Sequence, residues 1–406
     1  MNDYVPRAAC VSGPRPHAGR RAALACMVTL AVALGVGRFA FTPLLPLMLH
    51  GGALDLRHGG WLASLNYAGY FVGALSCVAL RMAPAKIVRA GLVATVLLTL
   101  AMGLTEQFWI WAAVRFVAGA VSAWTFVFAS QWGLRRLAQL GANEWGGVIY
   151  TGPGVGIIAT GLFVSAAGGL GAHTGWIGFG LISALLAALV WPAFGEDMRA
   201  LAPRVAASTA AGTAHDTGKD RRADAFWLVL LYGVPGFGYI ITATFLPVIA
   251  RHALPGSAWP DLFWPMFGAA LIAGALLAAR FPLHWDNRVM LAGAYVLQAV
   301  GIALGIVWPN AAGFSFGSVL IGLPFTAITL FAMREARLLR GEHAAAQMGY
   351  ATAAYGVGQI AGPLVAAPLA ASTGSFSPSL WLAAGALVAG ALGLLWRVWL
   401  TREAAR

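Results

Sequence analysis

Long apolar runs, separated by short polar segments, dominate the pattern of residues along the chain. A helix needs about 20 residues to cross the hydrocarbon core of a bilayer, and most of the apolar runs reach this length. The pattern therefore predicts an all-α integral membrane protein. The twelve transmembrane helices that we expect cover residues 22–49, 60–80, 87–104, 108–132, 146–168, 175–194, 226–250, 261–281, 289–308, 314–334, 347–371 and 379–399.

The composition supports this class, because only 10% of the 406 residues are charged and 60% are hydrophobic. Soluble domains usually carry about 25% charged residues, which cover their surface. The net charge of +12 raises nucleic acid as a partner, but the basic residues of such proteins form one face or stripe. Here the positive charges fall at intervals between the apolar runs, so we expect the lipid bilayer, and no nucleic acid, as a partner.

The positive charges also predict which way the chain crosses the membrane. All but four of the 26 Lys and Arg residues lie in the two terminal segments and in every second connecting segment. The four exceptions are Arg57 and Arg251 on the opposite side and Arg38 and Arg115 within predicted spans. An excess of Lys and Arg marks cytoplasmic segments. We therefore expect a multi-pass protein of the plasma membrane or the bacterial inner membrane, with both termini cytoplasmic.

An internal repeat divides the predicted spans into two halves. The segment GVGRFAFTPLLP, which contains Gly35, returns as GFGYIITATFLP 201 positions later, and GVGIIATG returns as GVGQIAGP after 202 positions. A parallel repeat of six spans is typical of many secondary transporters, so we expect two pseudo-symmetric six-helix bundles. The predicted divisions are a cytoplasmic tail over 1–21, the first bundle over 22–194, a cytoplasmic linker over 195–225, the second bundle over 226–399 and a cytoplasmic tail over 400–406.

Three glycine pairs of these repeats, in GVGRFA, GVGIIA and GVGQIA, match the G-x-G-x-x-G/A pattern of dinucleotide sites, but that pattern requires a strand before it and a helix after it. All of them lie inside apolar runs, where small residues let neighbouring helices approach closely. Cys10, Cys26 and Cys77 have no spacing that is typical of a metal site. We therefore interpret the glycines as helix packing and expect no nucleotide, other cofactor or metal.

Two arginines lie where charge is costly, Arg38 in the first predicted span and Arg115 in the fourth. An arginine at the centre of a bilayer costs about 2.5–3.5 kcal/mol on insertion scales, and no Asp or Glu is placed in the middle of a predicted span. The two arginines are expected at similar depth, facing one cavity. One hypothesis is that both bind an anionic substrate; the alternative is that each extends to the membrane surface or pairs with helix carbonyls.

Polar and aromatic residues at a similar level complete the predicted substrate site. Tyr239 takes the place of Arg38 in the second repeat. Each of these residues also fits packing or hydrogen bonding between helices. The candidate substrate-binding residues beside the two arginines are Tyr239, Gln359, Asn66, Tyr70, Trp124 and Tyr150, and Tyr67 lies near the same level.

With these motifs the chain resembles the major facilitator superfamily over nearly all of its length beyond residue 21. Arg115 and Gly119 resemble the R-x-x-x-G motif of the fourth span, and Gly152, Pro153 and Gly156 resemble the G-P-x-x-G motif of the fifth. The first span, with GVGRFAFTPLLPLM, resembles the YbfB/YjiJ-like branch. The segment after the second span keeps the positive charges of the superfamily signature but lacks its aspartate. The resemblance implies the major facilitator fold and a secondary transporter.

The residues and the resemblance together predict a secondary active transporter that moves a small, anionic organic solute by alternating access. We expect a monomer and no enzymatic activity, since no catalytic motif is visible. A proton is a candidate coupling ion, although no mid-span carboxylate offers it a carrier. The alternative is a proton-coupled exporter of hydrophobic or cationic compounds, and a remote alternative is a membrane receptor or enzyme.

Overall fold

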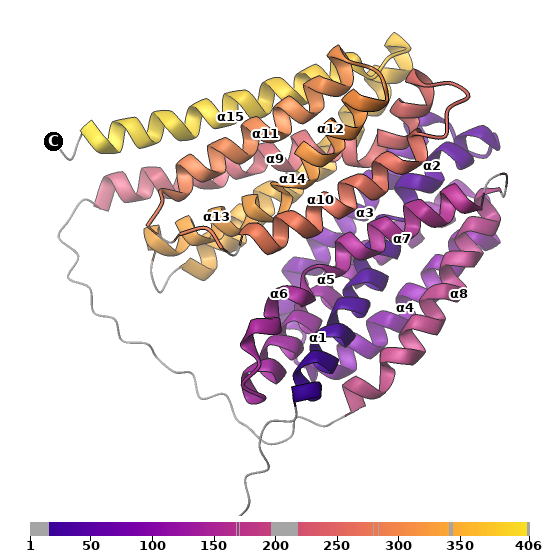
Figure 1. The fold of residues 1–406 in the computed structure, drawn as a ribbon, viewed down its shortest axis with the longest axis horizontal. Coiled ribbons are helices and arrows are strands. Elements are labelled where there is room, and N and C mark those ends of the chain that lie inside the picture. Colours follow the sequence, from indigo (N-terminus) through magenta and orange to yellow (C-terminus); the bar gives the residue numbers. More distant parts are fainter. Residues whose placement is uncertain are drawn as a thin grey trace, which may run out of the picture.

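The computed structural model describes residues 16–167, 169, 171–195, 218–278, 280–282, 284–340 and 344–403, and every regular element in them is a helix (Figure 1). The helices of the first half are α1 (Pro16–Leu30), a π-helical stretch (Ala31–Val36), α2 (Phe41–His50), α3 (Leu56–Ser76), α4 (Pro84–Leu104), α5 (Phe108–Gln139), α6 (Gly146–Ile149), α7 (Gly152–Ala166) and α8 (Ala172–Val190). Those of the second half are α9 (Gly218–Ala253), α10 (Pro260–Ala278), α11 (Asn287–Val307), α12 (Ala311–Gly322), α13 (Phe325–Arg340), α14 (Ala344–Thr373) and α15 (Ser377–Glu403). Short 3₁₀ helices cover Cys77–Ala79, Asn143–Trp145 and Trp191–Gly195.

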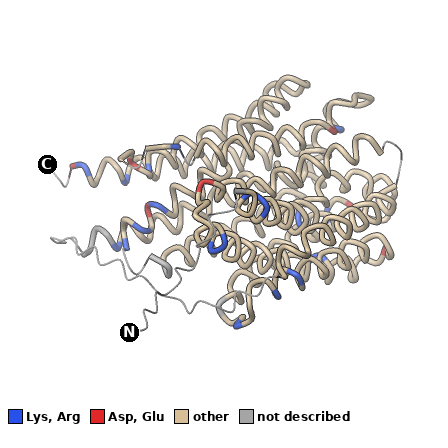
Figure 2. Tube along the Cα trace, turned by 60° about the horizontal axis from the view of Figure 1, so that its bottom comes forward, with Lys and Arg blue, Asp and Glu red and all other residues tan. Residues whose placement is uncertain are grey.

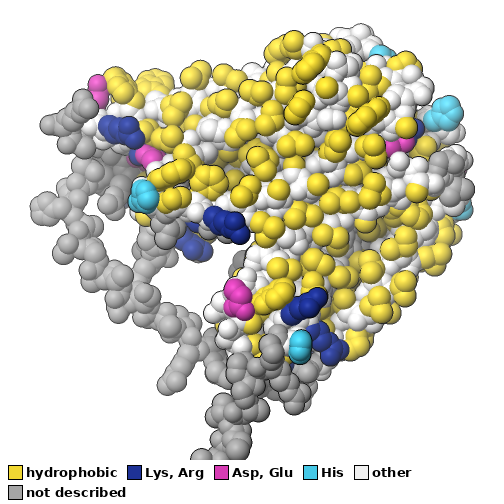
Figure 3. All heavy atoms as spheres, viewed as in Figure 1, with side chains coloured by type: hydrophobic (Ala, Val, Ile, Leu, Met, Phe, Trp, Pro, Cys, Tyr) yellow, Lys and Arg dark blue, Asp and Glu magenta, His cyan; other side chains and the backbone are white. Residues whose placement is uncertain are grey.

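These elements form the twelve predicted spans. Eleven helical stretches of the described residues are long and apolar enough to cross a membrane, the first running from His17 to His50 and the ninth from Ala311 to Arg340. The remaining predicted span, the second along the chain, is α3. It has 21 residues but carries charged and polar side chains such as Arg57 and Asn66. Hydrophobic side chains cover the outside of the helices (Figure 3), and charged residues are sparse along them (Figure 2). The chain is therefore a multi-pass membrane protein.

Some helices extend further than the apolar runs predict. The helix α9 begins at Gly218, inside the segment that was expected to be a linker, and α5 continues to Gln139. An ion pair explains the longer α9, because Arg397 of α15 donates from Nε and Nη2 to Asp224 Oδ1, at 2.9 and 2.7 Å. Hydropathy alone does not detect such polar support. Residues 1–15, 196–217 and 404–406, parts of the expected tails and linker, lie outside the described residues.

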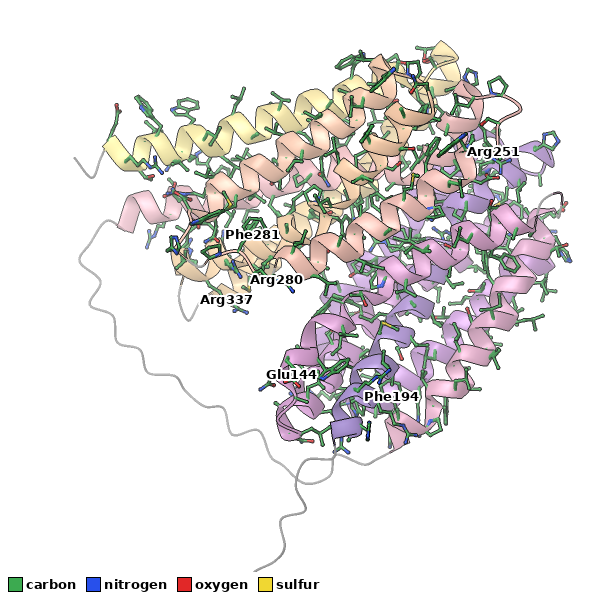
Figure 4. The ribbon with its side chains drawn as sticks, viewed as in Figure 1. Glu144, Phe194, Arg251, Arg280, Phe281 and Arg337 are labelled. Atoms are coloured by element: carbon green, nitrogen blue, oxygen red, sulfur yellow. The ribbon has the colours of Figure 1, made fainter. Side chains whose placement is uncertain are left out.

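The helices form two bundles, α1 to α8 and α9 to α15, which meet along α3 and α14, α7 and α10, and α2 and α9 (Figure 1). We call the end of the molecule where Gly195 and Gly218 lie the linker end. The bundles separate toward this end, and the surface is hollowed between them there (Figure 3). Glu144 lies on one side of the opening and Arg280 and Arg337 on the other (Figure 4). The described conformation is therefore open at the linker end.

The repeated glycines make equivalent close contacts in the two bundles. A methyl group on Gly35 would collide with the backbone of Gly156, and one on Gly358 would lie 3.1 Å from the carbonyl carbon of Gly236. The first contact joins the first and fifth spans, and the second joins the seventh and eleventh spans, which are their repeat counterparts. Close approach of helix backbones is a role of small residues in membrane helices. These glycines therefore allow close helix packing within each bundle.

Candidate functional site

The first span is interrupted where Arg38 lies. Ala31–Val36 form a π-helical stretch, and a turn over residues 37–40 connects it to α2. Pro43 has no N–H to offer the Phe39 carbonyl, and the N–H of Thr42 donates to that carbonyl instead, at 3.2 Å. In a regular α-helix the same N–H would bond the carbonyl of Arg38, which is therefore left for another donor. Such π-helical stretches are frequent at functional sites.

Arg115 of α5 provides that donor. Its Nη1 and Nη2 donate to the Arg38 carbonyl at 3.4 and 3.3 Å, and its Nε donates to the Leu62 carbonyl at 3.4 Å. The guanidinium carbon lies 4.7 Å from the centre of the Phe41 ring, and the residue is only 2% exposed. Asn66 donates from Nδ2 to the carbonyl of Arg115, at 2.9 Å. Arg115 therefore ties the interrupted first span to α5 through the Arg38 carbonyl and the Phe41 ring, and the Leu62 carbonyl and Asn66 tie Arg115 to α3.

The Arg38 side chain has a different environment. It is 6% exposed, and its guanidinium carbon lies 4.2 Å from the ring centre of Tyr70, 5.0 Å from that of Tyr67 and 5.2 Å from that of Phe39. Within the described part of the chain, neither Nε nor Nη2 of Arg38 has a hydrogen-bond partner. A buried donor without a partner costs about 1–3 kcal/mol. Arg38 is thus a buried cation, surrounded by aromatic rings, with N–H groups still available to a ligand.

The second bundle places a group of aromatic residues near this cation. Tyr239 of α9 accepts a hydrogen bond from Gln359 Nε2 of α14. Its ring stacks on Tyr355, with centres 5.9 Å apart, and Tyr355 in turn packs on Tyr232 at 5.0 Å. Tyr239 and Tyr355 lie close enough to Arg38 to interact with it electrostatically. Both bundles therefore contribute aromatic residues near one buried positive charge.

Hydrogen bonds between the bundles close this site on the side away from the linker end. Tyr67 and Ser64 precede Tyr70 along α3, which runs toward the linker end. Both residues, and Thr42 of α2, bond to the second bundle. The three hydrogen bonds join Thr42 Oγ1 to the Ala243 carbonyl at 2.9 Å, Tyr67 Oη to Thr244 Oγ1 at 3.0 Å, and Ser64 Oγ to the Ile360 carbonyl at 2.8 Å.

Two predicted residues lie apart from this group. Trp124 donates from Nε1 to Ser76 Oγ, at 2.8 Å, and lies about 14 Å along α5 from Arg115, toward the linker end. The Tyr150 ring packs edge to face against Phe126, with centres 6.3 Å apart. The structure thus brings together Arg38, Arg115, Tyr70, Tyr239 and Gln359. Asn66 lies next to this group and bonds the backbone carbonyl of Arg115. The substrate contacts of all eight residues stay predictions.

The sequence analysis did not identify three of the aromatic residues or the helix break as parts of the site. Tyr355 lies four residues before Gln359, and Tyr232 lies seven before Tyr239, so each shares a helix face with a predicted residue. Phe39 is next to Arg38. Helical spacing was therefore a usable signal for the tyrosines.

Comparisons with known proteins agree with this architecture. A family model described as "Uncharacterised MFS-type transporter YbfB" matches residues 30–395. A solved structure of a mutant of the nucleoside transporter NupG superposes with a TM-score of 0.69 and 15% identity, covering 93% of this chain and 99% of that one. At this identity the likeness shows the fold alone.

A relative from Streptomyces lividans is a "Chloramphenicol resistance protein", 39% identical over 158 residues. The match covers 37% of this chain and 38% of the relative, so it spans little more than a third of that protein. The family model, in contrast, matches most of the chain. The chain therefore belongs to the major facilitator superfamily of transporters, in the family of the MFS-type transporter YbfB.

Proposed function

We propose that the protein carries a small organic anion across the membrane by alternating access, and that Arg38 binds the anionic group. The observation that carries this proposal is the buried Arg38 guanidinium, whose Nε and Nη2 have no partner among the described residues. The ion pairs of the described residues involve neither Arg38 nor Arg115. A visiting anion would supply both the missing charge and the missing hydrogen-bond acceptors.

A carboxylate or phosphate is the chemistry that fits these donors. Hydrogen bonds between a guanidinium and either group are charge-assisted and often bidentate. The rings of Tyr70, Tyr67 and Phe39 lie 4.2–5.2 Å from the guanidinium carbon and stabilise it between transport cycles, by about 0.5–2 kcal/mol each. Nε and Nη2 stay without an acceptor among the described residues.

The other candidate residues take different roles in this proposal. Arg115 positions Arg38, because its guanidinium bonds the Arg38 carbonyl, and Asn66 supports Arg115. Tyr70, Tyr239 and Gln359 contact the bound solute. Trp124 and Tyr150 contact it on its path between the site and the linker end, which is the side toward which they lie.

The linker end is cytoplasmic in this proposal, because the excess of Lys and Arg belongs to its segments. The described conformation then opens to the cytoplasm. To open on the other side, the bundles must break the three hydrogen bonds next to the site and close at the linker end. A monomer in the plasma or bacterial inner membrane contains all the parts that this movement needs.

The Streptomyces relative favours a second candidate, a proton-coupled exporter of hydrophobic or cationic compounds. The support is the printed function of that relative together with its 39% identity over part of the chain. A cationic solute would be repelled by Arg38. A neutral apolar solute would instead use the aromatic rings, and its binding would not depend on the charge of Arg38.

Thermal unfolding of the purified protein distinguishes the two candidates. Organic carboxylates, organic phosphates, organic cations and chloramphenicol are each added to the wild type and to Arg38→Gln. The anion proposal expects one or more anions to stabilise the wild type and not Arg38→Gln, with Arg402→Gln as a control for charge alone. Stabilisation only by cations or neutral compounds, unchanged in Arg38→Gln, would overturn it in favour of the exporter.

A further inference from the structure

An apolar groove opens on the outer surface of the second bundle near the linker end. It has a volume of about 570 Å³ and lies between α10 and α11, with α13 as its floor. Leu277 of α10, Leu297 of α11 and Phe331 of α13 form its sides and floor, and the segment between α10 and α11 closes its end with Phe281 and Trp285. The groove is therefore made by three spans and one connecting segment.

The groove faces the region where lipid chains lie. Leu277 is 49% exposed, Trp285 44% and Phe281 36%, and the surrounding face of the bundle is covered by hydrophobic side chains (Figure 3). The described walls of the groove are helices, whose backbone groups bond within the helix as the hydrocarbon region requires. Tryptophan is enriched at the boundary between hydrocarbon and headgroups, so Trp285 marks the depth of the groove's end. The groove thus extends from the headgroup level into the hydrocarbon.

A positive charge lies at the headgroup end of the groove. Arg280 is an exposed member of its lining, and Figure 4 shows it beside Phe281. Arg334 donates from Nη1 to the Phe281 carbonyl at 3.5 Å, adding a second cation nearby. Among the described lining residues there is no Asp or Glu, and no described acid pairs with Arg280.

The acids that come next along the chain and on α13 pair with Arg288 and not with Arg280. Arg288 lies 3.2 Å from Asp286 and 3.6 Å from Glu335, measured between charged nitrogen and carboxylate oxygen atoms. Arg280 is left without an anionic partner among the described residues, whereas Asp286 and Glu335 share the cation of Arg288. The arrangement is an apolar channel that ends at an unneutralised cation.

We propose that this groove binds an anionic phospholipid, with one acyl chain between α10 and α11 and the phosphate at Arg280. Basic pockets between transmembrane helices at the cytoplasmic side bind anionic lipid headgroups. A zwitterionic lipid fills the groove less well, because its own cation lies next to Arg280. An apolar protein helix would leave Arg280 without a counter-charge, and a small polar solute would meet mostly apolar side chains among the described lining residues.

Native mass spectrometry of the full-length protein tests the site with two lipids that have the same acyl chains, a phosphatidylglycerol and a phosphatidylcholine. We expect the first bound phosphatidylglycerol to be retained about fivefold more strongly, which corresponds to about 1 kcal/mol for one arginine. Arg280→Gln removes this preference and Arg280→Lys keeps most of it. Arg402→Gln, at the same end of the bundle but outside the groove, leaves it unchanged.

A second pair of variants tests the groove itself. A Cβ atom added to Gly293 of the groove or to Gly385 of α15 would meet nothing within 4 Å, so neither position is blocked for a Gly→Phe substitution at its first side-chain atom. We expect Gly293→Phe to lower retention of both lipids and Gly385→Phe to lower neither. Equal retention of the two lipids by the wild type, equal losses in Arg280→Gln and Arg402→Gln, or full retention by Gly293→Phe would each overturn the proposal. Thermal unfolding confirms that each variant is folded.

Discussion

Replacing Arg38 with methionine should stabilise the protein in the absence of substrate. Methionine keeps much of the length of the side chain but removes the charge and the N–H groups that have no partner among the described residues. The same change removes the group that we propose binds the anion. If a residue lowers the stability of the fold but is needed for function, its replacement should raise the stability and abolish the function.

The structure sets the size of the effect. Two unpaired buried donors cost about 1–3 kcal/mol each, while the three nearby rings return about 0.5–2 kcal/mol each through cation–π attraction. Insertion scales give the whole arginine a cost of about 2.5–3.5 kcal/mol. We expect a net gain of about 1–2 kcal/mol for Arg38→Met. At about 2–4 °C per kcal/mol for long domains, the unfolding midpoint rises by roughly 2–8 °C.

Arg115→Met should change stability in the opposite direction. Its guanidinium donates to the carbonyls of Arg38 and Leu62 and packs on Phe41. Hydrogen bonds from charged groups contribute about 1.5–3 kcal/mol, so we expect a loss of about 2–4 kcal/mol and a fall of several degrees.

The assay is tryptophan fluorescence during a thermal ramp of the purified, substrate-free variants in one detergent. Arg402→Met is the control, since an exposed substitution usually changes stability by at most about 0.5 kcal/mol. If Arg38→Met lowers the midpoint as much as Arg115→Met does, Arg38 has structural partners of its own. The reasoning about its open donors would then be refuted.

Two further variants test the bundle interface and the linker end. Tyr67→Phe removes the hydrogen bond to Thr244, worth about 0.5–1.5 kcal/mol, and should shift the population toward the conformation closed at the linker end. Distances between spin labels across that opening measure this shift, and unchanged distances would contradict it. Asp224→Asn removes the charge that pairs with Arg397 and should speed amide hydrogen exchange in the first turns of α9 without changing exchange in α3. Equal protection of α9 in the wild type and in Asp224→Asn would show that the ion pair does not stabilise the start of α9.

Much of the fold was predictable because lipid imposes a simple rule on the chain. Each span has to be a helix with an apolar surface, so the hydrophobic runs found all twelve. Even α3 was found, although Arg57 and Asn66 lower its hydropathy. The helix extensions beyond the apolar runs were not predictable, because they depend on contacts such as Asp224 with Arg397 that join residues far apart in the sequence.

The site was predictable in its charges and not in its backbone. The two buried arginines were visible as charges in apolar runs, but their different environments depend on the π-helical stretch and on the Arg38 carbonyl, which Thr42 leaves free when its N–H donates to Phe39 instead. The first four residues of that stretch, Ala31 to Leu34, include neither glycine nor proline, so the sequence does not signal a helix break there. The structural feature beside the break is the close packing of Gly35 on Gly156. Tyr232 and Tyr355 required only the helical period to find them.

Uptake into proteoliposomes is the most direct test of the claim that Arg38 binds an anionic solute. The solute is the organic anion that most stabilises the purified protein, and the variants are Arg38→Gln, Arg38→Lys and Arg402→Gln. The account predicts uptake by the wild type and Arg402→Gln, reduced uptake by Arg38→Lys, which keeps a cation without the fork of the guanidinium, and none by Arg38→Gln. Uptake by Arg38→Gln at the wild-type rate would contradict it.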